Sequence, residues 1–133
     1  MPKFNKSNDE WKQDLSDLSF KVTREGATER PFSGQYNNFY ERGVFECICC
    51  GNKLFDSSRK FDSGTGWPSF DNPFSSTSLE EIEDNSHGMT RVEVRCSNCN
   101  AHLGHVFDDG PAPTNKRYCI NSASLNFIES TNE

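Results

Sequence analysis

Residues 91–99 read RVEVRCSNC and contain the clearest structural pattern of the chain. The first six of these residues alternate strictly, so Val92, Val94 and Cys96 fall on one face of an extended chain and the charged side chains on the other. Such alternation predicts a half-buried β-strand. The strand runs directly into the pair Cys96 and Cys99, so we expect strands that lead into cysteine-bearing turns.

A second pair with the same spacing, Cys47 and Cys50, follows an expected strand over 43–47. Each pair can close a tight turn, and Gly51 permits the left-handed backbone that such a turn needs. Four thiolates suit one tetrahedral ion and leave no position for water, which predicts a structural zinc. Iron, a redox-active Cys-x-x-Cys pair and a six-cysteine disulfide framework are the alternatives. The predicted ligands are Cys47, Cys50, Cys96 and Cys99.

Two cysteines lie outside this set. Cys49 is adjacent to Cys50 and should point away from the same ion, so we expect a small buried side chain, with a second redox thiol as the alternative. Cys119 belongs to neither pair. On an extended strand it shares a face with Arg117 and Asn121, where a guanidinium favours the thiolate and an amide can bind the sulfur or a bound oxygen. Cys119 is therefore the candidate nucleophile, and an inert strand cysteine is the alternative.

Three further residues are candidates for the same site. His102 and His105, three residues apart, could serve a metal or a proton transfer, and four cysteines that already complete an ion's shell weaken the metal role. Core or surface histidines remain the alternative. Trp67, in a Gly-Trp-Pro turn, is expected in the core unless the fold places it beside Cys119.

The 133 residues predict one domain, 1–133, with a core over about 8–128. Hydrophobic residues make up only 32% of the chain, but eleven phenylalanines can bury much apolar area and a metal would add stability. A net charge of −6 disfavours nucleic-acid binding. No apolar stretch could span a membrane and no secretory signal is evident, so we expect a cytoplasmic monomer.

At the N-terminus, Ser7 and Glu10 have the spacing of a capping box. Trp11, Leu15 and Leu18 follow at i, i+4 and i+7, which predicts one amphipathic helix of about ten residues.

The rest of the chain is expected to be mainly β, with antiparallel sheets because the connections are short. Residues 26–42 are interpreted as a loop and the acidic run 80–84 as a solvated face without function. The last strand is expected to run from about 117 to 128.

Four blocks of the sequence resemble the B-type methionine-R-sulfoxide reductases in their zinc-containing form. They are FDSGTGWPSF (61–70), SHGM (86–89), RCSNCNAHLGHVF (95–107) and RYCINSASL (117–125). The blocks occur in family order, and the resemblance covers residues 8 to 128. It implies two antiparallel β-sheets, short N-terminal helices and zinc knuckles away from the active site.

The resemblance also implies an activity, the reduction of methionine-R-sulfoxide, mainly in proteins, to methionine. Cys119 would attack the sulfoxide sulfur and become a sulfenic acid, while His102 and His105 protonate the departing oxygen. Trp67, with help from Phe127, would hold the substrate methyl group. Arg117 and Asn121 would orient the site.

Thr65 departs from the pattern of many family members, which carry there a cysteine that resolves the sulfenic acid. Threonine cannot form that disulfide. We expect direct reduction by thioredoxin or another thiol; attack by Cys49 and release of a zinc thiolate are the alternatives. A zinc-ribbon-like protein-binding module without catalysis, and a thiol oxidoreductase that uses a Cys-x-x-Cys pair, are the rival functions.

Overall fold

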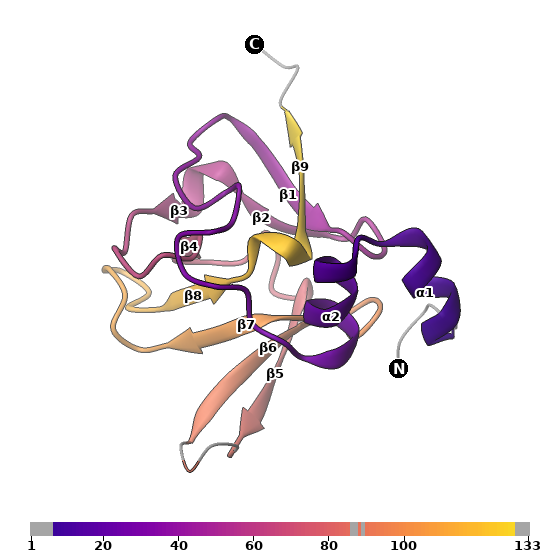
Figure 1. The fold of residues 1–133 in the computed structure, drawn as a ribbon. Helices are drawn as coiled ribbons and strands as arrows, with labels where there is room; N and C mark the ends of the chain where they lie inside the picture. The colour runs from indigo at the N-terminus through magenta and orange to yellow at the C-terminus, as the bar shows by residue number, and fades with distance from the viewer. Residues whose placement is uncertain (1–6, 86–87, 89, 130–133) are drawn as a thin grey trace.

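Two antiparallel β-sheets make up most of the computed structural model, which describes residues 7–85, 88 and 90–129 (Figure 1). The strands are β1 (Gly43–Cys47), β2 (Lys53–Asp56), β3 (Lys60–Phe61), β4 (Ser69–Phe70), β5 (Leu79–Asp84), β6 (Arg91–Cys96), β7 (His102–Phe107), β8 (Arg117–Ile120) and β9 (Leu125–Glu129). The smaller sheet has the order β2-β1-β9, and the larger one has the order β3-β4-β8-β7-β6-β5. The predicted fold class is confirmed, as is the strand over residues 91–96.

The N-terminal segment forms two helices, α1 (Asn8–Asp14) and α2 (Asp17–Glu25), which confirms the short helices that the resemblance implies; the single helix expected from the apolar spacing is wrong. The capping box is present, since Ser7 N–H donates to Glu10 Oε1 at 2.8 Å and Glu10 N–H donates to Ser7 Oγ. The apolar spacing spans a break between the two helices. The second helix begins after Ser16, whose side chain caps it by accepting a hydrogen bond from the Ser19 amide. Leu18 is consequently 50% exposed.

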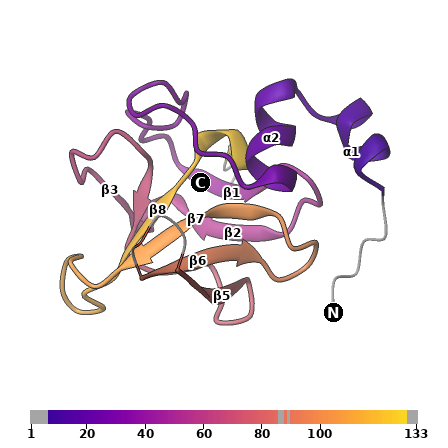
Figure 2. The same cartoon turned by 60° about the horizontal axis from the view of Figure 1, so that its bottom comes forward.

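Helix α2 packs its buried Phe20 and Val22 toward the body of the protein and contacts β7 and the 3₁₀ turn η3 (Ser122–Ser124). Figure 2 shows α2 beside the start of β7, with α1 farther out. The helix ends at Gly26, whose φ of 76° suits glycine. Within the described ranges, neither helix is long and apolar enough to cross a membrane.

Aromatic side chains fill the space between the sheets. Phe55 from the smaller sheet stacks on Phe70 from the larger one, with ring centroids 4.2 Å apart. Phe45 packs edge-on against Phe70 and Tyr36. Each fully buried ring contributes about 2–3 kcal/mol, so a few large side chains give this polar sequence its core.

The C-terminal segment is not one continuous strand, which corrects the expectation for residues 117–128. Strand β8 ends at Ile120, the chain turns through η3, and β9 then joins the other sheet. Side chains hold the crossing: Ser122 Oγ accepts from the Tyr36 amide and Ser124 Oγ donates to the His102 carbonyl at 3.0 Å. The period-two pattern of β8 therefore does not continue into β9.

The acidic run 80–84 lies in β5, the edge strand of the larger sheet, where Glu80, Glu81 and Glu83 are exposed as expected of a solvated face and, of the acidic residues, only Asp84 is half-buried. Charged side chains are common on edge strands because they discourage pairing with another chain. The last residue of this strand, Asp84, contacts a histidine of β7.

Candidate active site

A β-bulge in β7 places both predicted histidines on one side of the larger sheet. Gly104 pairs with Val94 but His102 pairs with Arg95, so Leu103 is the extra residue. In a regular strand, residues three apart would point to opposite faces. Here the rings of His102 and His105 are neighbours, with centroids 5.7 Å apart.

Cys119 lies directly across the strand ladder from His105. Both line a cavity of about 270 Å³ on the face of the larger sheet opposite the core. Strand β8 alternates, so Tyr118 and Ile120 are buried in the core while Arg117 and Cys119 face the cavity. The prediction that Arg117, Cys119 and Asn121 share a face is confirmed. The residues that line the cavity are Thr28, Thr65, Trp67, Arg91, Gly104, His105, Phe107, Arg117, Cys119 and Asn121.

Burial raises the pKa of the Cys119 thiol above its ordinary value, and the negative charge of Glu29 adds to the rise. The positive charge of Arg117 and a hydrogen bond with the Thr65 hydroxyl act in the opposite direction without outweighing burial. Arg117 also forms a bidentate ion pair with Asp109, at 2.8 and 3.2 Å. Arg117 therefore favours the thiolate as expected, but burial outweighs it and the net shift of the Cys119 pKa is upward.

Asn121 braces the cavity through both ends of its amide. Its Nδ2 donates to the carbonyl of Leu103, the bulged residue, at 3.0 Å. Its Oδ1 accepts from the buried Glu29 amide at 2.9 Å. Asn121 thus ties β8 to the bulge and to the segment between α2 and β1.

Trp67 is held in the cavity wall because its indole Nε1–H donates to the Glu29 carbonyl at 3.0 Å. The carboxylate of Glu29 in turn accepts from the Ala123 amide at 2.9 Å. Glu29 therefore connects the indole to the turn that follows Asn121.

His102 faces a second cavity, of about 260 Å³, which adjoins the first along Thr28, Arg91 and His105. Its Nδ1 lies 2.6 Å from Glu93 Oε2, and its Nε2 is buried without a hydrogen-bond partner. Burial lowers the pKa of His102 below its ordinary value, although the hydrogen bond and charge of Glu93 oppose this effect.

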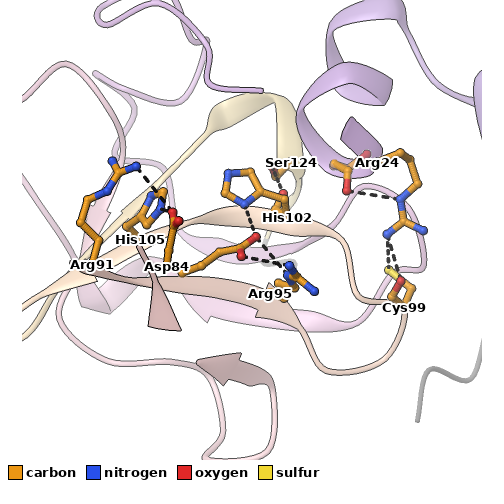
Figure 3. A network of polar contacts seen from close by, with 10 residues as sticks. Arg24, Asp84, Arg91, Arg95, Cys99, His102, His105 and Ser124 are labelled. Atoms are coloured by element: carbon orange, nitrogen blue, oxygen red, sulfur yellow. Dashed lines mark hydrogen bonds and ion pairs between the residues drawn. The ribbon is translucent and has the colours of Figure 1, made fainter. Parts of the chain in front are cut away.

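His105 has a carboxylate partner of its own. Its Nε2 lies 2.9 Å from Asp84 Oδ2, which also lies 3.5 Å from Arg91 Nη2 (Figure 3). Such carboxylate contacts fix the orientation of an imidazole ring.

The structure does not bring Phe127 to the Cys119 cavity. Because the chain changes sheets at η3, Phe127 lies on β9 and packs against Phe39 and Phe45, with ring centroids 4.7 and 5.1 Å apart. It belongs to the aromatic core.

Four cysteines form a candidate metal centre at the ends of β1 and β6, one strand from each sheet. Cys47 Sγ lies 3.6 Å from Cys99 Sγ, Cys50 Sγ lies 3.6 Å from Cys96 Sγ, and all four sulfurs lie within 4.8 Å of one another. A tetrahedral zinc with bonds of about 2.3 Å requires sulfurs about 3.8 Å apart. The four side chains are positioned to bind a metal ion, and Cys49 is not one of them.

The local backbone explains why the sulfurs converge. Gly51 and Asn100, each directly after a Cys-x-x-Cys pair, have φ of 81° and 65°, and glycine and asparagine tolerate this conformation best. Arg24 of α2 donates to the Cys99 carbonyl at 2.9 Å and lies 3.7 Å from its sulfur (Figure 3). A cation here offsets the charge of clustered thiolates.

Sequence reasoning missed Glu29, Asp84, Glu93 and Arg91. The alternation of residues 91–96 places Arg91 and Glu93 on the face of β6 that carries the cavities, so the sequence pattern could have indicated these two residues. Nothing local marks Glu29 or Asp84, whose partners are distant in sequence. Within the SHGM block, Ser86, His87 and Met89 lie outside the described residues.

The site is thus a half-buried thiol opposite a carboxylate-bound histidine, in a fold that also carries four cysteines positioned to bind a metal ion. Residues 15–129 match the SelR domain. The chain is 56% identical over 127 residues to the peptide methionine sulfoxide reductase MsrB of Hahella chejuensis, covering 96% of this chain and 91% of that protein. It is 56% and 52% identical over 128 residues to proteins of the same name from Pseudomonas fluorescens Pf0-1 and Pseudomonas aeruginosa PAO1, covering 96% of this chain and 98% and 97% of theirs. The chain therefore belongs to the SelR domain family, that of the B-type methionine sulfoxide reductases.

Proposed function

We propose that the protein reduces methionine-R-sulfoxide, mainly within proteins, to methionine, with Cys119 as the nucleophile. The observation that carries this proposal is the cavity in which Cys119 lies opposite His105 and shares the wall with Trp67. Membership of the family indicates the substrate. The cavity contains a nucleophile, an acid–base group and an aromatic surface for the substrate's methyl group.

In the reaction, the Cys119 sulfur attacks the sulfoxide sulfur and takes over its oxygen. The sulfoxide is reduced by two electrons to the thioether, and Cys119 is oxidised by two electrons to the sulfenic acid. The step starts from the thiol, which burial favours over the thiolate, so the proton of Cys119 balances it. His105, oriented by Asp84, passes that proton to the oxygen, and His102 supports it from the adjoining cavity. Arg117 and Asn121 position the sulfur.

Regeneration requires an external thiol, with thioredoxin as the proposed reductant. Among the described residues that line the cavity, Cys119 is the one cysteine, and Thr65 lies beside it. Two thiol groups of the reductant reduce the sulfenic acid to the thiol and leave as a disulfide, with release of water.

Zinc is the proposed metal of the four-cysteine centre, because four thiolates at tetrahedral spacing suit it. Its role would be structural, since it would join a strand of each sheet. We further propose that residues 1–133 act as one catalytic domain and that the protein works as a cytoplasmic monomer in the repair of oxidative damage.

The test is to incubate the protein with dithiothreitol and each sulfoxide epimer of N-acetylmethionine amide, and to measure the thioether released. Activity on the R epimer that disappears in Cys119→Ser is the expected result. Activity on the S epimer alone, or full activity in the variant, refutes the proposal. Absence of turnover on both epimers would favour a binding module.

The regeneration route can be tested by counting free thiols after one turnover without reductant. One thiol lost per chain indicates a persistent sulfenic acid, whereas two indicate an internal disulfide and contradict external reduction. Thr65→Cys is the matched comparison, because a thiol at this position lies beside Cys119 and should raise the loss to two.

A further inference from the structure

Phe32, in the segment between α2 and β1, combines two unusual properties. Its side chain is 69% exposed, more than the other exposed large hydrophobic residues of the described chain. Its φ is +64°, a conformation that side chains with a Cβ rarely adopt. The other two non-glycine residues with positive φ in the described ranges are Asn100 and Asn115, and asparagine tolerates this region.

Close contacts with Gly66 fix this conformation. The Phe32 amide donates to the Gly66 carbonyl at 2.7 Å. A Cβ on Gly66 would lie 2.7 Å from Pro31 Cβ and 2.8 Å from a ring carbon of Phe32, so only glycine fits beneath the ring. One side of the ring therefore rests on the backbone at Gly66, and the rest faces solvent.

Gly66 directly precedes Trp67, which lines the Cys119 cavity. Three residues before Phe32, Glu29 holds the Trp67 indole and the Asn121 side chain through its own backbone. In Figure 1 this segment passes in front of β8 and β4. Phe32 itself does not line the cavity, but it lies against Gly66, whose neighbours Thr65 and Trp67 do.

Stability does not explain this arrangement. A strained backbone raises the free energy of the folded protein, and a ring that is mostly exposed contributes little hydrophobic stabilisation to offset this cost. Backbone strain of this kind is concentrated at functional sites.

The size of the cavity indicates what the ring contacts. About 270 Å³ can enclose one methionine sulfoxide side chain, and it lies below the range of pockets that enclose a larger ligand. The residues that flank the sulfoxide in a polypeptide must therefore lie across the rim. Methionine oxidation disrupts cores and Met-rich interfaces, so the sulfoxides it produces lie in regions rich in apolar side chains.

We propose that Phe32 is a docking residue for polypeptide substrates and contacts an apolar side chain next to the methionine sulfoxide. This inference rests on the proposed function and deepens it. Among oxidised polypeptides, it assigns the protein a preference for those with apolar residues next to the sulfoxide.

The experiment compares two substrates, N-acetylmethionine-R-sulfoxide amide and a peptide with leucines on both sides of the sulfoxide. Phe32→Ala should lower kcat/KM for the peptide about tenfold, the equivalent of about 1.4 kcal/mol, mainly through KM. The small substrate should change less than twofold. Phe74→Ala is the matched control, because Phe74 is 45% exposed and contacts Lys53 and Leu54, which are not next to residues of the cavity wall.

The variant Phe32→Gly distinguishes the loss of the docking contact from an effect of backbone strain. Glycine adopts a φ of +64° readily, so this variant should keep the segment in place while lacking the ring. It should unfold at the same urea concentration as the wild type or higher, and show the same selective loss. Equal losses on both substrates, or no loss on the peptide, overturn the inference. A wild type that reduces neither substrate instead refutes the proposed function.

Discussion

Gly104→Ala should damage both stability and the active site, because Gly104 lies against the backbone of the strand that carries Cys119. A Cβ at this position would lie 2.0 Å from the Cys119 carbonyl oxygen, whereas ordinary contacts begin near 3.4 Å. The neighbouring atoms are backbone, so β7 and β8 must separate by about 1.4 Å, the difference between these two distances. Overpacking of this kind typically costs about 1–3 kcal/mol, and a weakened ladder hydrogen bond adds about 1 kcal/mol.

We therefore expect a loss of about 3 kcal/mol, which lowers the urea midpoint by about 1.5 M at a typical m-value. Activity per folded molecule should fall at least tenfold, because the clash moves Cys119 relative to His105.

Gly43→Ala is the matched control in the other sheet. A Cβ there would lie 2.2 Å from the Ile128 carbonyl oxygen, near a strand end and away from the Cys119 cavity. This variant should lose stability but keep its kcat when folded. A Gly104→Ala protein with wild-type urea midpoint and kcat would refute the reasoning.

Four other variants test the electrostatics and the metal centre. Arg117→Met should shift the pH profile of Cys119 alkylation by iodoacetamide to higher pH, since a cation that lowers the pKa of the thiol is removed; an unchanged profile contradicts this. Stability to urea should decline as the pH falls below about 6.5, because burial lowers the pKa of His102 in the folded protein and the unfolded chain then binds more protons. His102→Gln should flatten that decline, and an equally steep decline in the variant counts against the assignment. Cys47→Ser should lose bound metal by elemental analysis and lower Tm by about 10 °C or more, whereas Cys49→Ser should retain the metal; equal metal content in the two variants would contradict the ligand set.

Short-range patterns predicted much of the fold. The alternation of residues 91–96 gave a strand with correct ends, and the spacing of the cysteine pairs gave the four-sulfur cluster. The shared face of Arg117, Cys119 and Asn121 also followed from strand periodicity. These features depend only on neighbours in the chain.

The errors arose where distant contacts decide the structure. Strand periodicity alone would separate the two histidines, and the bulge that unites them depends on pairing with β6 and on the side chain of Asn121. The change of sheet after Ile120 depends on Tyr36 and Ser122, which are 86 residues apart. Asp84 was interpreted as solvated because its partner, His105, is 21 residues away.

The extra residue at Leu103 also has a consequence for how this enzyme family can be compared and redesigned. Deleting one residue from β7 would restore regular pairing but turn one histidine to the other side of the sheet. A sequence alignment that places a gap between His102 and His105 would therefore equate residues that face opposite sides. Any scaffold chosen to receive this site must reproduce the irregular strand as well as the side chains, because the spacing of the two histidines has meaning only together with the bulge.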